Sequence, residues 1–171
     1  MSDILYEDSL WKIVKETGHL PDGRVKVQTR VHGLDIVHIL AFPKPDTILL
    51  LREFRPFHGE WLWQLPSGRV DKEKDMMTAA QRELQEETGF RAKILKHYFS
   101  TRNGESVQLA NHIFLAEDLE KAPLQQDAYE LIEVHEVSLI DALKGVRENR
   151  YAHHTPTAYA LLRYAVEKGI V

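Results

Sequence analysis

The sequence predicts an α/β protein in which a mixed β-sheet is surrounded by three helices. Two observations carry this prediction: β-branched and apolar residues recur in several short segments, and one long run of good helix formers is bounded by helix-capping residues. The 171 residues contain no repeats, low-complexity tracts or long linkers rich in proline, glycine and serine. This organisation is typical of one domain, with or without an appended element.

The first half of the chain is predicted to form strands. Residues 11–15 and 24–31 are rich in β-forming side chains, and the turn-forming run GHLPDG separates them, so we expect a hairpin. Four further segments have strand character, namely residues 35–42 and 47–53, which flank the turn PKPD, and residues 92–100 and 110–115.

The clearest predicted helix covers residues 76–88. Asp75 is a suitable N-cap, and Gly89 lies where a helix commonly ends in a left-handed residue. Two later helices are expected, one capped by Ser138 and reaching about Val146, and one with Thr155 as N-cap, Pro156 as first residue and an end near Gly169.

The predicted helix at residues 76–88 concentrates carboxylates near its C-terminal end. At about 100° per residue, Glu83, Glu86 and Glu87 fall within an arc of about 100°, next to Arg82. Glu83 and Glu87 are an i,i+4 like-charge pair, which destabilises an open helix by roughly 0.2–0.5 kcal/mol. A divalent cation reverses that sign, because hard ions such as Mg2+ prefer carboxylate and carbonyl oxygen. For a Glu-Glu pair taken alone, a solvated acidic face is the alternative interpretation.

The spacing of the surrounding residues favours the cation site. Gly68 is followed after thirteen residues by the run RELQEETGF, from Arg82 to Phe90. The pattern resembles the Nudix box, which consists of a glycine, five residues, a glutamate, seven residues and then Arg-Glu-aliphatic-any-Glu-Glu-any-Gly-apolar. One defining position differs, because Lys74 stands in place of the first glutamate and Glu73 lies one residue early. The departure puts in question the role of that glutamate, which is to orient Arg82 or to hold an outer metal.

The resemblance to the Nudix family implies a mixed sheet sandwiched between helices and a Mg2+ site, with Mn2+ as an alternative ion. By the match, Glu83, Glu86 and Glu87 are metal ligands, and the backbone carbonyl of Ser67 completes the shell. Arg82 is expected to be structural, because it lies four residues before Glu86 and can fix the direction of that carboxylate.

The resemblance extends upstream of the box. Residues 52–57, REFRPF, and 61–68, WLWQLPSG, are similar to the corresponding run in ADP-ribose and nucleoside diphosphate sugar pyrophosphatases. Those enzymes carry an N-terminal antiparallel sheet that pairs with a second subunit. Residues 1–42 have the length and strand character of this extension, so the resemblance implies a homodimer, with residues 43–171 as the hydrolase domain. The alternative is a hairpin that covers its own domain.

A general base in the related enzymes comes from a loop just before a strand that reads like Ile-Glu-Val. In this chain the loop is QQDAYELIEV, residues 125–134, and Glu130 and Asp127 are the candidates. Glu86 is counted with them as catalytic. If Ala128 replaces a carboxylate of the family, another group serves as base or the metal ion alone activates the water. A charged, solvated loop is the alternative.

Five residues outside the box are the predicted substrate contacts. Arg52 and Arg55 are chosen because a guanidinium group binds two phosphate oxygens at once. Trp61 and Trp63 point to one side of an extended segment and can stack on a nucleobase, although such tryptophans more often lie in a core. Tyr129 is expected either to line the pocket or to cover its edge.

The histidines carry no metal prediction. The nine histidines are scattered without the spacing of a metal site, so none is assigned to a metal. His153, His154 and Thr155, which precede the last helix, are candidates to border the substrate.

Composition excludes several other classes of protein. The chain has no cysteine, which rules out disulfides and zinc-thiolate sites and favours a reducing cytoplasm. The N-terminal residues are acidic where a signal peptide is basic, and no apolar stretch approaches the ~20 residues of a membrane span. We therefore expect a soluble cytoplasmic protein with no membrane partner. A net charge of −4 argues against broad binding of nucleic acid.

The resemblance implies hydrolysis of the pyrophosphate bond in a nucleoside diphosphate sugar, with ADP-ribose as the first substrate to test. The expected products are a nucleoside monophosphate and a sugar phosphate, formed by metal-activated water. Two alternatives remain. The first is a Nudix hydrolase of a nucleoside triphosphate, a dinucleoside polyphosphate or capped RNA. The second is a sensor that binds a nucleotide sugar without cleaving it.

Overall fold

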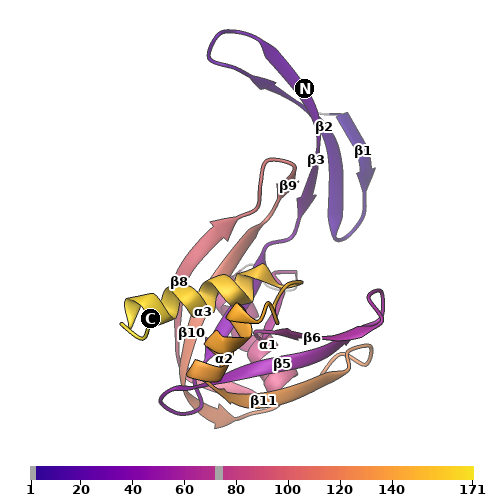
Figure 1. The fold of residues 1–171 in the computed structure, drawn as a ribbon. Coiled ribbons are helices and arrows are strands. Elements are labelled where there is room, and N and C mark those ends of the chain that lie inside the picture. Colours follow the sequence, from indigo (N-terminus) through magenta and orange to yellow (C-terminus); the bar gives the residue numbers. More distant parts are fainter. Residues whose placement is uncertain (1–2, 72–74) are drawn as a thin grey trace.

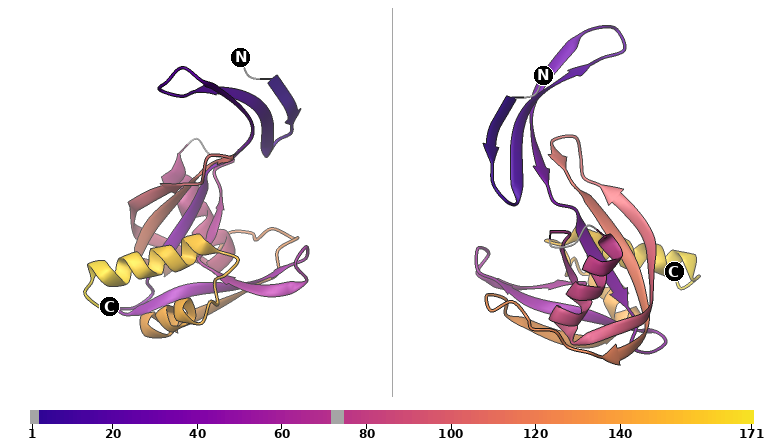
Figure 2. Two further views of the ribbon diagram at one scale, coloured as in Figure 1. Left: turned by 45° about the horizontal axis from the view of Figure 1, so that its top comes forward. Right: turned by 180° about the vertical axis from the view of Figure 1, so that it is seen from behind.

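The computed structural model describes residues 3–71 and 75–171. An N-terminal sheet projects away from the body of the molecule, as the two rotated views also show (Figures 1 and 2). Its strand order is β1-β2-β3-β9. The strands are β1 (Asp3–Glu7), β2 (Trp11–His19), β3 (Val25–Gly33) and β9 (Val107–Gln108). β2 and β3 are antiparallel, with Trp11 opposite Gly33 and His19 opposite Val25, which confirms the predicted hairpin.

Two further sheets form the body of the molecule. The first is mixed, has the order β7-β4-β10-β8 and contains one parallel pair, β4 with β10. Its strands are β4 (Ile36–Ala41), β7 (Ser67–Arg69), β8 (Phe90–Arg102) and β10 (Ala110–Lys121). The second is antiparallel and has the order β11-β5-β6. Its strands are β5 (Thr47–Arg55), β6 (Glu60–Gln64) and β11 (Ile132–Ser138).

The strands on either side of the PKPD turn belong to different sheets. The turn between β4 and β5 is closed by an isolated bridge between Lys44 and Thr47. The predicted division of the chain at residue 42 places β4 in the N-terminal extension, whereas β4 pairs with β7 and β10 in the body. The division into 1–42 and 43–171 stays a prediction.

The three predicted helices are present, as α1 (Met76–Thr88), α2 (Leu139–Arg147) and α3 (Thr155–Glu167). The Asp75 side chain accepts from the backbone N–H groups of Met77 and Thr78, and Gly89 is left-handed with φ 75°. The expected N-cap of the last helix was wrong by one residue: His154 is the N-cap, and Thr155 is already helical. The first turn accommodates the proline at its second residue, and the backbone N–H of Thr157 donates to the carbonyl of His154 at 3.0 Å.

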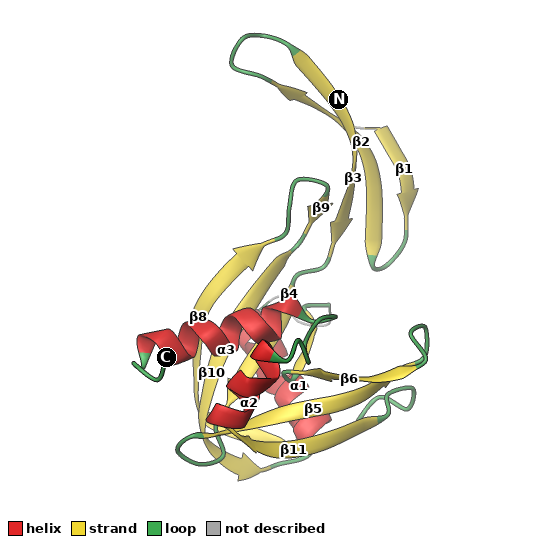
Figure 3. Ribbon diagram, viewed as in Figure 1, coloured by secondary structure: helices red, strands yellow, loops and turns green. Residues whose placement is uncertain are grey.

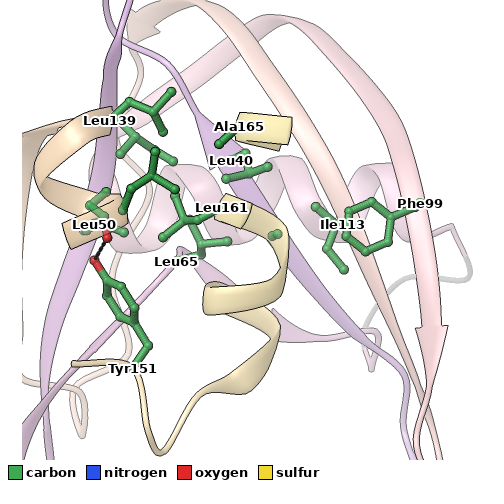
Figure 4. Packing of buried hydrophobic residues seen from close by; sticks show 13 residues of the cluster. Leu40, Leu50, Leu65, Phe99, Ile113, Leu139, Tyr151, Leu161 and Ala165 are labelled. Carbon is green, nitrogen blue, oxygen red and sulfur yellow. Dashed lines mark hydrogen bonds between the residues drawn. The ribbon is translucent and has the colours of Figure 1, made fainter. Parts of the chain in front are cut away.

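The helices lie on opposite faces of the sheets, with α1 on one side and α2 and α3 on the other (Figures 1 to 3). Each side has its own apolar cluster. Leu84 and Phe114 are buried in the cluster under α1, and Leu50 and Leu161 in the cluster under α3. In the second cluster the Tyr151 hydroxyl donates to the carbonyl of Ala142 at 3.2 Å (Figure 4). In the described part of the chain, no helix is long and apolar enough to span a bilayer.

Candidate active site

The short strand β7 and helix α1 meet at Gly68 and Glu83. A Cβ atom on Gly68 would lie 2.0 Å from Cδ and Oε1 of Glu83, so a side chain at position 68 would displace the carboxylate. Only glycine leaves that space open, because it has no side chain. Gly68 is therefore required for the position of Glu83 rather than for a turn.

Glu87, one turn after Glu83, is tied to the same strand, β7. The backbone N–H of Ser67 donates to Glu87 Oε2 at 2.7 Å. Glu83 and Glu87 are 9% and 6% exposed. Two carboxylates are thus buried side by side on α1, at the face that packs against β7.

Arg82 connects the remaining carboxylate to this pair. Its Nη1 donates to Glu86 Oε2 at 2.7 Å and lies 2.8 Å from Glu83 Oε1. Its Nη2 is 3.3 Å from the carbonyl of Arg69 and 3.4 Å from Asp71 Oδ1. The guanidinium group therefore orients Glu86, as the spacing of the box predicts, and at the same time holds the loop after β7.

The electrostatics of this cluster favour a cation. Burial raises the pKa of Glu83 to about 7, against the effect of Arg82, and the nearby charges of Glu86 and Glu130 add to the rise. Burial also raises the pKa of Glu87 well above its ordinary value, and the neighbouring Glu83 raises it further. Negative charge at these positions is costly when nothing cationic is bound.

The predicted catalytic loop reaches the same place. The charge of Glu130 raises the pKa of Glu83 and Glu87, and also that of Glu53 on β5. Asp127 lies in the same loop, where its Oδ1 accepts from the backbone N–H of Tyr129 at 2.9 Å. Residues from β5, α1 and the loop before β11 therefore converge, although they are far apart in the sequence.

These groups surround one cavity of about 360 Å³. Seven of the predicted site residues line it, namely Ser67, Glu83, Glu86, Glu87, Asp127, Glu130 and Arg55. The other four, Arg52, Trp61, Trp63 and Tyr129, are not among the lining residues.

The alternation of β5 and β6 explains why Arg52 and the two tryptophans lie elsewhere. Arg55 lines the cavity, and Arg52 lies on the opposite face of β5, opposite Trp63 on β6. The Arg52 guanidinium lies 5.1 Å from the centre of the Trp61 ring, and the Trp63 ring lies 4.8 Å from that of His135. Tyr129 is 96% exposed on its loop.

Two polar residues beside Arg55, Glu53 and Gln64, are not among the site residues predicted from the sequence. Glu53 is 4% exposed, and its Oε2 accepts from Gln64 Nε2 at 2.7 Å and lies 2.8 Å from Arg55 Nη2. Arg55 in turn donates to Gln64 Oε1 at 2.9 Å. Burial raises the pKa of Glu53, and Arg55 opposes this rise. The available signal was the two-residue period of β5, which puts Glu53 on the same face as Arg55.

The sequence indicates His154 only as a candidate to border the substrate. It lines the cavity, whereas His153 and Thr155 do not. His153 instead lies 3.7 Å from Glu60 on β6.

The carboxylate set fits a hard divalent ion that shares its coordination with a substrate. Among residues 3–71 and 75–171, no three His, Cys, Asp or Glu side chains form a ready-made metal cage. Mg2+ rarely uses such a cage, and is usually held by one or two carboxylates together with waters and substrate phosphates. Buried carboxylates that repel one another beside an open cavity meet this description.

The position that departs from the box, Lys74, and its neighbour Glu73 lie outside the described residues. Within the described loop, Asp71 is an acidic side chain in contact with Arg82. A carboxylate therefore reaches this arginine from the loop between β7 and α1.

Comparisons with known proteins agree with this geometry. A family model described as NUDIX domain matches residues 32–158. An ADP-ribose pyrophosphatase of Bacillus subtilis (strain 168) is 36% identical over 152 residues, which cover 85% of this chain and 80% of that protein. An ADP-ribose pyrophosphatase of Saccharomyces cerevisiae is 45% identical over 67 residues, covering 38% of this chain and 29% of that protein.

A crystal structure of an ADP compounds hydrolase superposes with a TM-score of 0.80, covering 100% of this chain and 95% of that one. Its sequence identity is 20%, so this likeness shows the fold alone. Together, the family match over residues 32–158, the relative with 36% identity and the glutamates of α1 around the cavity show that the chain belongs to the Nudix family.

Proposed function

We propose that this chain is a Nudix pyrophosphatase that hydrolyses the pyrophosphate bond of ADP-ribose and similar nucleoside diphosphate sugars. The products are a nucleoside monophosphate and a sugar phosphate. The observation that carries the proposal is the convergence of carboxylates from α1 and the loop before β11 on one cavity that also contains Arg55. The similarity to ADP-ribose pyrophosphatases from two organisms supports the choice of substrate.

Glu83, Glu86 and Glu87, with the backbone carbonyl of Ser67, would hold Mg2+, and Mn2+ is an alternative. Such an ion neutralises diphosphate oxygens and lowers the pKa of a water molecule. The protein holds the carboxylates in place, through the Ser67 amide for Glu87 and the Arg82 guanidinium for Glu86.

Glu130 is the better candidate to accept the proton of the attacking water. Its charge raises the pKa of both Glu83 and Glu87, and it lines the same cavity as these proposed metal ligands, which supports this choice. Asp127 also lines the cavity and is the second candidate, and its Oδ1 accepts from the Tyr129 amide. Glu86 remains a third candidate for a direct catalytic role, beside its proposed contact with the metal.

Arg55 is the proposed phosphate contact. Gln64 and Glu53 hold its Nη2, so the guanidinium group is positioned before a substrate arrives. Arg52, Trp61, Trp63 and Tyr129 stay predictions as substrate contacts. A ligand longer than the cavity would have to extend beyond its lining residues to reach them.

The N-terminal sheet is the proposed dimerisation element. It projects from the body (Figure 1). Apolar side chains are exposed on two of its strands, Ile4 and Tyr6 on β1 and Val25 and Val27 on β3. A second copy of the chain would cover this apolar surface. The proposed location is the cytoplasm, because a chain without cysteine gains nothing from an oxidising compartment.

A product-resolved screen in Mg2+ tests the reaction and the substrate together. The panel contains ADP-ribose, GDP-mannose, ATP, a dinucleoside polyphosphate and capped RNA. We expect AMP and ribose 5-phosphate from ADP-ribose, and loss of this activity in Glu86→Gln and Glu87→Gln.

Unchanged Mg2+-dependent hydrolysis in either glutamine variant would show that the metal site is assigned wrongly. Faster turnover of another member of the panel would replace the proposed substrate. Binding of ADP-ribose without any product would make the protein a sensor instead.

A further inference from the structure

We propose that His154 is a substrate-binding residue that donates a hydrogen bond from Nε2–H to a phosphate oxygen of the diphosphate. The inference rests on the proposed function, because it needs a diphosphate in the cavity that His154 lines. His154 would be a neutral, directional hydrogen-bond donor in a cavity lined mainly by charged side chains.

Hydrogen bonds fix the orientation of the His154 ring. The backbone N–H of Leu65 donates to the Thr157 hydroxyl at 2.9 Å, and this hydroxyl lies 2.7 Å from His154 Nδ1. Thr157 is fully buried, so its hydroxyl cannot donate to water. Within the described part of the chain, His154 Nδ1 is the acceptor for the Thr157 O–H. The hydroxyl therefore donates to Nδ1, so the proton of the neutral ring is on Nε2.

A second buried histidine, His38, lies beside His154 but does not accept a hydrogen bond from its Nε2–H. His38 Nε2 lies 2.9 Å from Asn111 Oδ1, and the Asn111 amide nitrogen donates to Asn103 Oδ1 at 3.0 Å. Because Asn111 Oδ1 only accepts, His38 donates through Nε2, and its buried Nδ1 is a lone pair without a partner among residues 3–71 and 75–171. The two imidazole rings lie 5.1 Å apart in an edge-to-face arrangement.

The Nε2–H of His154 is therefore available to a ligand. In the described residues no group accepts from it, and even the adjacent lone pair of His38 is not used. His154 lines the cavity together with Arg55 and the carboxylates of α1. His154 therefore brings a donor to the wall of the space that a diphosphate would occupy.

The surroundings of His154 keep its ring neutral. Burial, the neighbouring His38 and the charge of Arg55 lower the pKa of His154 to about 3. A neutral ring with its proton on Nε2 cannot serve as a general base, because Nδ1 already accepts from Thr157. Its chemistry is that of a hydrogen-bond donor to an anionic oxygen, which adds direction to the charge supplied by Arg55.

Substitution of His154 tests the donor. His154→Leu removes it, and His154→Gln replaces Nε2–H with an amide N–H. We expect His154→Leu to raise KM for ADP-ribose about tenfold with kcat changed less than about threefold, because the bond is made to the substrate before and during reaction. His154→Gln is expected to restore most of the loss. His153→Leu, on the neighbouring exposed residue, is the matched control.

Two measurements do not depend on turnover. The affinity for inorganic pyrophosphate in Mg2+, measured by calorimetry, should fall about tenfold in His154→Leu and stay unchanged in His153→Leu. The 15N chemical shifts of His154 should show the Nε2-protonated tautomer from pH 5 to 8. Thermal unfolding of each variant establishes that it is folded.

A loss confined to kcat, an unchanged affinity for pyrophosphate, or a proton on Nδ1 would each overturn the role of His154. If the native chain does not hydrolyse ADP-ribose, the proposed substrate fails. The pyrophosphate affinity and the tautomer then still decide whether His154 is a phosphate donor.

Discussion

At the scale of single residues, the site depends on groups whose roles follow from what they touch. Gly68 is needed because Glu83 occupies the space of a side chain, and Ser67 matters through its amide, which binds Glu87. The spacing of the box identifies the same residues as a pattern. The contacts supply the physical reason for the pattern.

Gly68→Ala should therefore impair the enzyme more than it impairs the fold. The new methyl group displaces the Glu83 carboxylate, and a misplacement of about 1 Å at a catalytic group costs roughly 10²-fold in rate. Steady-state kinetics with ADP-ribose and Mg2+ would show a loss of about this size in kcat/KM. Gly104→Ala, where an added methyl group meets no atom within 4 Å, should retain activity and serves as the control.

The buried carboxylates also predict a pH-dependent stability of the metal-free protein. The pKa of Glu83 is raised from 4.5 to about 7, so its favourable contribution is complete below pH 4.5 and is lost as pH rises toward 7. The buried His38 and His154 act in the opposite direction, because their pKa values are lowered to about 4 and about 3. The contribution of Glu83 must therefore be measured as the difference in free energy of unfolding between the native chain and a variant that lacks this carboxylate.

The comparison is between the native chain and Glu83→Gln in chelator, by urea unfolding at pH 5 and pH 8. The free energy of unfolding of the native chain, relative to the variant, should fall by on the order of 2 kcal/mol between pH 5 and pH 8. Mg2+ should reduce this fall in the native chain. A difference that does not change with pH would contradict the raised pKa of the buried Glu83 carboxylate.

At the scale of elements, local sequence signals locate most helices and strands. The helix at residues 76–88 has the expected bounds because its signals are local, with a side-chain cap before it and a left-handed glycine after it. Which strands pair is a different matter. β4 lies beside β10, about 75 residues later in the chain, because the helices cover the apolar faces of both strands together.

The cap of α1 offers a test at this scale. Asp75→Ala removes the oxygens that accept from the Met77 and Thr78 amides, and should lower the free energy of unfolding by about 1 kcal/mol. Asp75→Asn, which keeps a capping oxygen, should stay close to the native value. Equal losses in both variants, measured by urea unfolding, would mean that the charge of Asp75 and not its cap stabilises the helix.

At the scale of the whole molecule, the projecting N-terminal sheet is the feature that a single chain explains least well. Val25 and Val27 on β3 are 57% and 54% exposed. They lie on the same face of the strand, because side chains alternate along it. A second copy of the chain would remove this apolar surface from water.

Val25→Glu combined with Val27→Glu should therefore convert a dimer into a monomer. Light scattering after size exclusion should give twice the chain mass of 19.8 kDa for the native protein and the single mass for the double variant. Lys26→Gln, on the opposite face of β3, is the control and should remain dimeric. A native protein of single-chain mass would leave the sheet without this role.

The sequence by itself determined the family, the helix that carries the glutamates, and Asp127 and Glu130 in the loop before β11. Each of these follows from local capping signals or from the spacing of residues along the chain. Only the tertiary structure decided which side chains share a cavity. The period of β5 already separates Glu53 and Arg55 from Arg52. Only packing turned the face of Glu53 and Arg55 toward the glutamates of α1 and brought His154 to the same cavity, while Trp61 and Trp63 lie on the face of Arg52. The physical reason is that the spacing of residues determines which side chains share one face of a helix or strand. Which other elements that face contacts depends on how the elements pack together.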